Sequence, residues 1–292
     1  MVLAEFFIGI HFLIIGLRGK TLDWCKSFLL GRCQRVCVGS HVSSIEPLSA
    51  GVPQGAILSP LLFSLYINDV VGCADADFNL FADDTSVYVC DKSAATLQVR
   101  LQAVLDELSA WFRSWAIAVN HQKSAVMVLT RRRNAPLINV HLDGTPLPQV
   151  TTHKHLGIIF NSRLSWSDHT SYVIGKASKK VGLLRRFRCR LPCLVLRSLY
   201  LSCVRPTLEY ACRAWSGVGS QEALRLERTQ RAAARVIAGA SLKDKLSAEL
   251  LLAHAGLDPL AQCRQVALCL TFYCLSRPVP KGHSILSTRS VV

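Results

Sequence analysis

The pattern of apolar and polar positions divides the chain near Trp166. Before this residue short elements alternate, and beyond His169 apolar residues recur at helical spacing. Residues 22–30 have the pattern of a short amphipathic helix, and residues 35–42 alternate like a strand. The chain is therefore predicted to be mixed α and β in its first part and mainly helical in its second.

Two further helices are predicted in the first part. Ser59 followed by Pro60 is typical of a helix start, with the serine as N-cap, and the helix is expected to end near Gly72. A longer stripe at helical spacing predicts a helix with its apolar face in the core: Leu97, Leu101, Leu105, Leu108, Phe112 and Trp115.

The strongest strand signal is a hairpin. Residues 78–82 and 86–89 are β-prone, and Asp83, Asp84 and Thr85 between them are expected at its tip. Further strands are predicted over residues 124–130, 138–142 and 155–160, the second of them turning at Asp143-Gly144.

The opening residues 1–16 are apolar, but they are shorter than the ~20 residues of a membrane-spanning helix. Glu5 and His11 interrupt them, no basic residue precedes the apolar run, and no small-residue cleavage pattern follows. A membrane-attached interaction protein would rest on this segment alone, so we expect no stable membrane association.

Charge is distributed unevenly. The chain has 34 basic and 19 acidic side chains, and residues 171–292 contribute 20 of the former and 6 of the latter, which is +14 of the net +15. This asymmetry indicates a polyanionic partner for the second part. The candidate nucleic-acid-binding residues come from its densest basic cluster: Lys176, Lys179, Lys180, Arg185 and Arg186.

The twelve cysteines are scattered through a chain that has ample apolar residues for a core. We therefore expect reduced, buried thiols in an intracellular protein of the cytoplasm, the nucleus or both, and neither a disulfide scaffold nor a zinc site.

Adjacent carboxylates on a rigid turn can chelate a hard divalent cation. Taken alone, Asp83 and Asp84 are more typical of a solvated surface turn than of a metal site. The segment Gly51–Gly55 is compatible with an ordinary glycine- and proline-rich loop that leads into a helix. The order of these parts changes the interpretation: GVPQG, then LSPLLFSLYINDV, then FADDTSVY, then WFRSWAIAVNHQK and HLGIIFNSRLSWSDH.

This order resembles reverse transcriptases. Together with RGKTLDWCKSFLLGRCQRVCVG upstream and the tail from YACRAWSG onward, it resembles the enzymes of non-LTR (LINE-type, jockey-like) retrotransposons over residues 17–285. The resemblance implies an α+β fold with an incomplete palm, made of an antiparallel sheet with flanking helices, followed by a mainly helical thumb and connection region. The expected parts are an unrelated apolar lead-in (1–16), a partial palm (17–165), a basic thumb and connection region (166–285) and a tail (286–292).

The resemblance also implies roles for individual residues. Asp83 and Asp84 would be catalytic and would bind Mg²⁺ or Mn²⁺. The residues expected near nucleotide and template are Gly51, Pro53, Gln54, Gly55 and Lys123. The implied partners are an RNA template and a DNA primer.

One family feature has no counterpart in the sequence. Relatives carry a third carboxylate shortly upstream of the segment that matches RGKTLDW, where residues 1–16 contain no Asp. We therefore expect an N-terminally truncated RNA-directed DNA polymerase with impaired nucleotidyl transfer, and whether the chain is an active enzyme stays open. The alternative is a catalytically inactive transposon relic that only binds nucleic acid.

Overall fold

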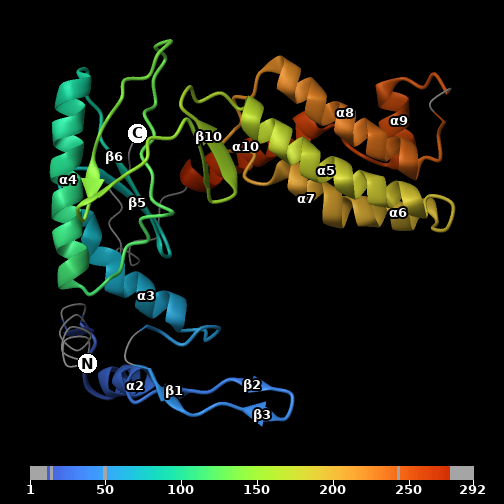
Figure 1. The fold of residues 1–292 in the computed structure, drawn as a ribbon. Helices are drawn as coiled ribbons and strands as arrows, with labels where there is room; N and C mark the ends of the chain where they lie inside the picture. The colour runs from blue at the N-terminus through green and yellow to red at the C-terminus, as the bar shows by residue number, and fades with distance from the viewer. Residues whose placement is uncertain (1–11, 14–15, 49–50, 242–243, 277–292) are drawn as a thin grey trace. The chain divides into compact units, whose positions relative to one another are not determined.

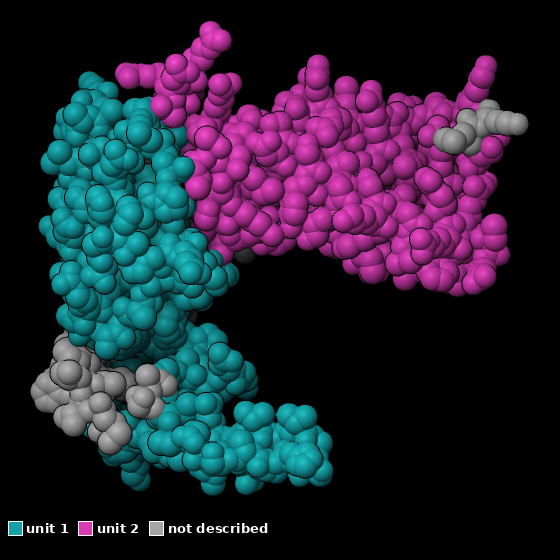
Figure 2. Space-filling model, in the orientation of Figure 1, with its two compact units in different colours: residues 1–128, 136–149 teal, residues 129–135, 150–292 magenta. Residues whose placement is uncertain are grey.

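The computed structural model describes residues 12–13, 16–48, 51–241 and 244–276. The chain divides into two compact units, which Figure 2 colours separately. Unit 1 comprises residues 1–128 and 136–149, and unit 2 comprises residues 129–135 and 150–292. Most of the apolar segment 1–16 lies outside the described residues.

Unit 1 begins with helix α2 (Gly19–Leu29), which confirms the predicted amphipathic helix. The apolar face of α2 packs with Phe12 and with Leu62 of the next helix. A ribbon of short strands follows: β1 (Cys33–Gln34) pairs with β4 (Glu46–Pro47), and β2 (Cys37–Val38) with β3 (His41–Val42) (Figure 1). The single strand expected over residues 35–42 is therefore wrong, because Gly39 adopts φ +60° and turns the chain back on itself.

The centre of unit 1 is a hairpin packed on a long helix. Helix α3 (Ser59–Ile67) continues as the 3₁₀ helix η1 (Asn68–Gly72), and helix α4 spans Ala94–Ser114. Between them, β5 (Asp77–Phe81) and β6 (Asp84–Tyr88) form the predicted hairpin. The apolar stripe of α4 forms the core with one face of the hairpin and with Ile138 and Val140, so both predictions are confirmed.

The segment before and after residue 135 forms less regular structure than predicted. The strand expected over 124–130 is reduced to one bridge between Val126 and Gln149. Within 138–142, only His141–Leu142 (β7) is a strand, and it pairs with Thr145–Pro146 (β8) across the predicted Asp143-Gly144 turn. Glutamine side chains replace the missing strand partner: Gln98, Gln102 and Gln149 accept the amide hydrogens of residues 139, 141 and 138.

Unit 2 begins with a second hairpin. Strands β9 (Thr152–His155) and β10 (Ile158–Asn161) pair in antiparallel fashion, and β10 packs on helix α5 (Ser167–Phe187) (Figure 1). The single strand expected over 155–160 is wrong, because Leu156 and Gly157 both adopt positive φ and form the turn between two strands.

The rest of unit 2 is helical, as predicted. Its elements are α6 (Cys193–Leu199), the π-helix η2 (Tyr200–Val204), α7 (Arg205–Glu209), α8 (Ser220–Ile237), α9 (Ala248–Ala255) and α10 (Leu260–Ser276). The π-helix precedes Pro206, which has no amide hydrogen to donate to the carbonyl of Ser202, and the amide of Arg205 instead reaches Tyr200.

The core of unit 2 includes one buried polar network. Fully buried Tyr200 donates its hydroxyl to Oε1 of Gln230 on α8 at 2.7 Å, and Nε2 of Gln230 donates to the carbonyl of Asp258 at 2.8 Å. Burial raises the pKa of the Tyr200 phenol far above its usual range, so this group stays a neutral donor. The network ties η2, α8 and the segment just before α10 together.

The mixed α and β composition is confirmed, with the strands of the described residues arranged as five separate antiparallel pairs. The expected burial of the cysteines is wrong for most of them: all twelve are free thiols, and eight are exposed. Across the residues that the structure describes, no helix combines the length and apolar composition needed to cross a membrane.

Candidate functional site

The two aspartates predicted as metal ligands lie at the tip of the β5–β6 hairpin. Phe81 pairs with Asp84, so the turn consists of Ala82 and Asp83, and Ala82 adopts φ +51°. The tip is thus one residue earlier than predicted, because Asp84 and Thr85 already belong to β6. The carboxylates of consecutive residues, one in the turn and one at the start of β6, thus lie at a hairpin tip that the strand pairing holds in place.

Packing of the hairpin orients these carboxylates towards solvent. Phe78, Leu80 and Val87 point to the core of unit 1, whereas the alternate positions of β5 and the two end residues of β6 are exposed. Asp83 and Asp84 are both exposed. None of the described residues forms an ion pair with either carboxylate. Their oxygens are therefore available to a ligand.

The donor set at the tip suits a hard divalent cation, because it consists of carboxylate oxygens on a defined turn. Two aspartates by themselves do not surround a cation. Within the described ranges, no three His, Cys, Asp or Glu side chains gather as a metal site. The aspartates thus fit a site that takes its further oxygen ligands from substrate or from other groups.

The GVPQG loop is held from two sides. Arg32 donates from Nε to the carbonyl of Leu29 at the end of α2 (2.8 Å), and from Nη2 to the carbonyl of Gly51 (2.5 Å). On the other side, the buried Ser59 hydroxyl donates to the carbonyl of Pro53 at 2.5 Å. The predicted N-cap role of this serine is wrong, because α3 begins at Ser59 itself and its side chain holds the loop instead.

These contacts leave the middle of the loop accessible. Gln54 and Gly55 are exposed, and Gly51 and Gly55 adopt φ +78° and +82°, which only glycine reaches without strain. Sequence reasoning missed the parts played by Arg32 and Ser59. Arg32 is nineteen residues from its loop contact, so no local pattern indicates it.

Lys123 lies in a turn whose amide contacts Asn120, and its side chain is exposed. The described hydrogen bonds do not link it to the hairpin tip or to the loop. Arg32, Ser59 and α3 therefore position the loop, β5 and β6 position the aspartates, and Lys123 belongs to a third segment of unit 1.

The predicted basic cluster lies on α5 of unit 2. Lys176, Lys179, Arg185 and Arg186 are exposed. Lys180 differs, because its Nζ donates to the carbonyl of Cys203 and to Oγ1 of Thr207, both at 2.7 Å. This ammonium group fastens α5 to the η2–α7 segment. Helix α8, which packs on α5, adds further arginines: Arg225, Arg228, Arg231 and Arg235.

Comparisons with known proteins show which family the chain resembles. Residues 7–160 match the reverse transcriptase (RNA-dependent DNA polymerase) family. Among curated proteins, a probable RNA-directed DNA polymerase from transposon X-element of Drosophila melanogaster is 31% identical over 73% of the chain. The RNA-directed DNA polymerase from mobile element jockey of the same fly is 29% identical over 74%.

A third relative, a probable RNA-directed DNA polymerase from transposon BS of Drosophila melanogaster, is 28% identical over 73% of the chain. The matched regions cover 24%, 25% and 25% of these three relatives, so the chain spans about a quarter of their length.

Proposed function

The chain belongs to the reverse transcriptase family and carries the reverse transcriptase domain of a non-LTR retrotransposon, and we propose that it acts in RNA-directed DNA synthesis through Asp83 and Asp84. The observation that carries this proposal is the pair of exposed carboxylates at the tip of the β5–β6 hairpin, Asp83 in its turn and Asp84 at the start of β6.

Asp83 and Asp84 would hold the divalent metal that this family uses, with Mg²⁺ or Mn²⁺ as the ion. Bound metal neutralises charge on the triphosphate and on the attacking and leaving oxygens of the transfer. The hairpin contributes orientation. Its inner face is anchored in the core of unit 1, so the backbone that carries the carboxylates is already ordered before the substrate binds.

The GVPQG loop is proposed to lie against the incoming nucleotide and the template. Backbone at Gly51 and Gly55 has no side chain to keep a base or phosphate away, and Gln54 offers an exposed amide for hydrogen bonding. Arg32 and Ser59 would keep the loop in one conformation. Lys123 is proposed to contact the phosphates.

Residues 17–165 would form the partial palm, and residues 166–285 the thumb and connection region. The boundary between the units falls near residue 150, and the β9–β10 hairpin packs with the helical region that follows it. The exposed basic residues of α5 and α8 would neutralise phosphates of the RNA template and the DNA primer.

Primer extension on an RNA template tests this function. The purified chain is compared with an Asp83→Asn/Asp84→Asn variant in Mg²⁺ and in Mn²⁺. The matched control is Asp77→Asn, which removes one exposed carboxylate from the other end of the same hairpin. We expect extension by the wild type and by the control, and a loss of at least a hundredfold in the double variant.

A companion binding assay distinguishes a loss of catalysis from a loss of nucleic-acid binding. Binding of an RNA–DNA hybrid should be nearly equal in all three proteins, because the aspartates lie outside the basic helices. Extension that survives in the double variant would refute the assignment of Asp83 and Asp84. Absent extension in every protein, with hybrid binding intact, would instead favour the nucleic-acid-binding relic.

A further inference from the structure

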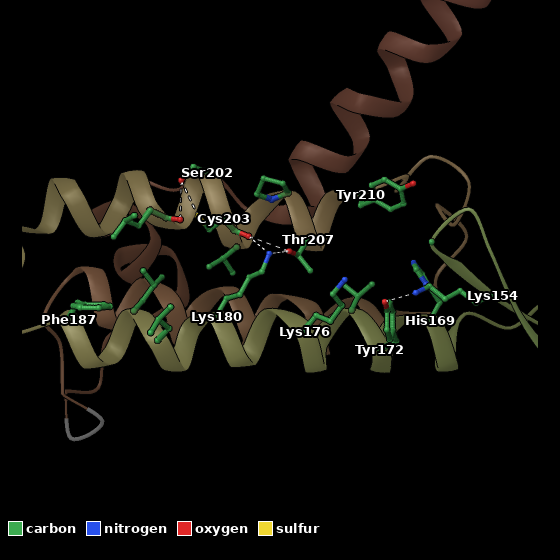
Figure 3. A pocket seen from close by; sticks show the side chains of 17 residues that line it. Lys154, His169, Tyr172, Lys176, Lys180, Phe187, Ser202, Cys203, Thr207 and Tyr210 are labelled. Atoms are coloured by element: carbon green, nitrogen blue, oxygen red, sulfur yellow. Dashed lines mark hydrogen bonds between the residues drawn. The ribbon is translucent and has the colours of Figure 1, made fainter. Parts of the chain in front are cut away.

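Helix α10 presents an apolar surface to solvent. Its inner side packs on the core of unit 2 through Leu260 and Ala267, and it contacts α8. This surface is separate from the groove of Figure 3, which lies between α5 and the η2–α7 segment and borders the basic residues of α5. Large apolar side chains of α10 are more than half exposed: Val266 (52%), Leu270 (54%), Phe272 (66%) and Tyr273 (55%).

Most of these side chains belong to one row along the helix. Positions 262, 265, 269, 272 and 276 follow one another at intervals of three and four residues, which is the spacing of a seam between packed helices. Val266 and Tyr273 lie beside this row and line one hollow with Cys269. We refer to these seven positions as the α10 seam. The half-buried residues lie on the other side of the helix: Cys263, Arg264, Ala267, Leu268 and Thr271.

The α10 seam is uncharged, although the chain as a whole is strongly basic. No charged side chain occurs from Gln265 to Ser276, whereas the net charge of the chain is +15. Arg264, the charged residue just before this stretch, is turned inwards. Its guanidinium carbon lies 4.3 Å from the ring centroid of Trp215, and its Nη2 donates to the carbonyl of that residue at 3.2 Å. Two copies of the chain can therefore meet at this seam without bringing like charges into contact.

The α10 seam is also complementary to itself. When a second copy of the helix runs antiparallel, with Cys269 of both copies at a two-fold axis, each position after 269 faces the position equally far before it. Val266 then faces Phe272 of the second copy, and Gln262 faces Ser276. Apolar groups meet apolar groups and polar groups meet polar groups, which is what an interface between two identical surfaces requires.

We propose that the α10 seam is a self-association surface whose occupant is the same seam of a second copy, in antiparallel orientation. One helix pair forms a small interface, so we expect a weak dimer that depends on protein concentration. The two Cys269 side chains would lie at the axis, within reach of a disulfide. Cys274 would face position 264 and lie ten residues (274 − 264) from Cys274 of the second copy, about 15 Å along the helix axis.

Sedimentation velocity of the full chain, freed of nucleic acid by nuclease treatment, measures the dimer over a range of protein concentrations. Val266→Lys and Phe272→Glu should each raise the dissociation constant about tenfold or more, because each places an unpaired charge in the seam. The double variant Val266→Lys/Phe272→Glu should regain much of the lost affinity, because the lysine of each copy then faces the glutamate of the other. Leu194→Lys and Leu194→Glu, the same changes at an exposed apolar residue of α6, are the matched controls and should leave the dimer unchanged.

Oxidation by diamide, which takes up the two hydrogen atoms that two thiols lose, tests the register. The cross-linked dimer should be lost in Cys269→Ser and kept in Cys274→Ser, and far-UV circular dichroism checks the folding of every variant. A wild type that is monomeric at all concentrations would overturn the proposal. A dimer that persists in both single-charge variants, or that the double variant does not regain, would overturn it as well. None of these results bears on the proposed function, which primer extension tests.

Discussion

Replacing either of two adjacent lysines on α5 by methionine should change the stability of unit 2 by very different amounts. Lys180→Met removes the group that donates to Cys203 and Thr207, whereas Lys179→Met removes an exposed charge of the same helix. Cys203 is the penultimate residue of the π-helix η2. Pro206, which follows, already disturbs the regular hydrogen-bond pattern there. Its carbonyl depends on the ammonium group and on the weaker contact of Thr207 at 3.3 Å.

The expected destabilisation by Lys180→Met follows from these contacts. Hydrogen bonds of charged groups contribute about 1.5–3 kcal/mol each, but this site is half-buried, so water replaces part of the loss. We expect Lys180→Met to cost about 2 kcal/mol of the unfolding free energy of unit 2. Lys179→Met should stay within about 0.5 kcal/mol, as is usual for exposed positions.

Hydrogen exchange of α5 and α8 amides measures this difference in the full chain without assuming that both units unfold together. A loss of about 2 kcal/mol corresponds to roughly 30-fold faster exchange of the most protected amides. Equal exchange in the two variants would refute the structural part assigned to Lys180. Hybrid binding by Lys180→Met should fall no more than that of Lys179→Met.

Three further results are expected. Burial lowers the pKa of His169, so unit 2 should be fully stable above about pH 6.5 and lose stability as the pH falls below it. Protection factors of α5 amides, which are corrected for the intrinsic exchange rate at each pH, should differ less between pH 7 and pH 5 in His169→Gln than in the wild type. Ser59→Ala removes the bond to Pro53 and should speed amide exchange in the GVPQG loop about fivefold, with no change in unit 2. Tyr200→Phe leaves the buried Oε1 of Gln230 without its donor and should cost about 1–3 kcal/mol of unfolding free energy. Tyr210→Phe loses a hydrogen bond to the carbonyl of Leu156 on a half-exposed ring and should cost far less. Similar amide exchange in the two variants would contradict this reasoning.

The sequence predicted the elements that have a local signal. The stripe from Leu97 to Phe112 repeats at helical spacing over many residues, and the structure forms α4 there. The Asp83–Asp84 hairpin was predicted because two β-prone runs flank a short polar turn. In both cases neighbouring residues determine the structure, so no distant contact was needed to find it.

The errors come from turns and from distant partners. Residues 35–42 alternate like a strand and residues 155–160 are β-prone, so each was predicted as a single strand. Glycines at 39 and 157 instead permit tight turns, and the chain forms a hairpin at each place. Around residues 138–141, amide hydrogens are accepted by glutamines of α4 and by Gln149, so the chain stays extended without a neighbouring strand. Such pairings cannot be deduced from a periodic pattern.

The same limit applied to the candidate site. Asp83, Asp84 and the GVPQG loop were found from their motifs, whereas Arg32 reaches the loop from the end of another helix. Ser59 was predicted as a helix N-cap, but its side chain holds the loop instead.

Binding of Mn²⁺ at the hairpin tip tests the central claim most directly. Electron paramagnetic resonance reports free Mn²⁺ during titration of the chain in the presence of an RNA–DNA hybrid and nucleoside triphosphate. Wild type and Asp77→Asn should bind the ion equally, and Asp83→Asn/Asp84→Asn should lose the site. Equal binding by all three proteins would contradict the assignment of Asp83 and Asp84 as metal ligands.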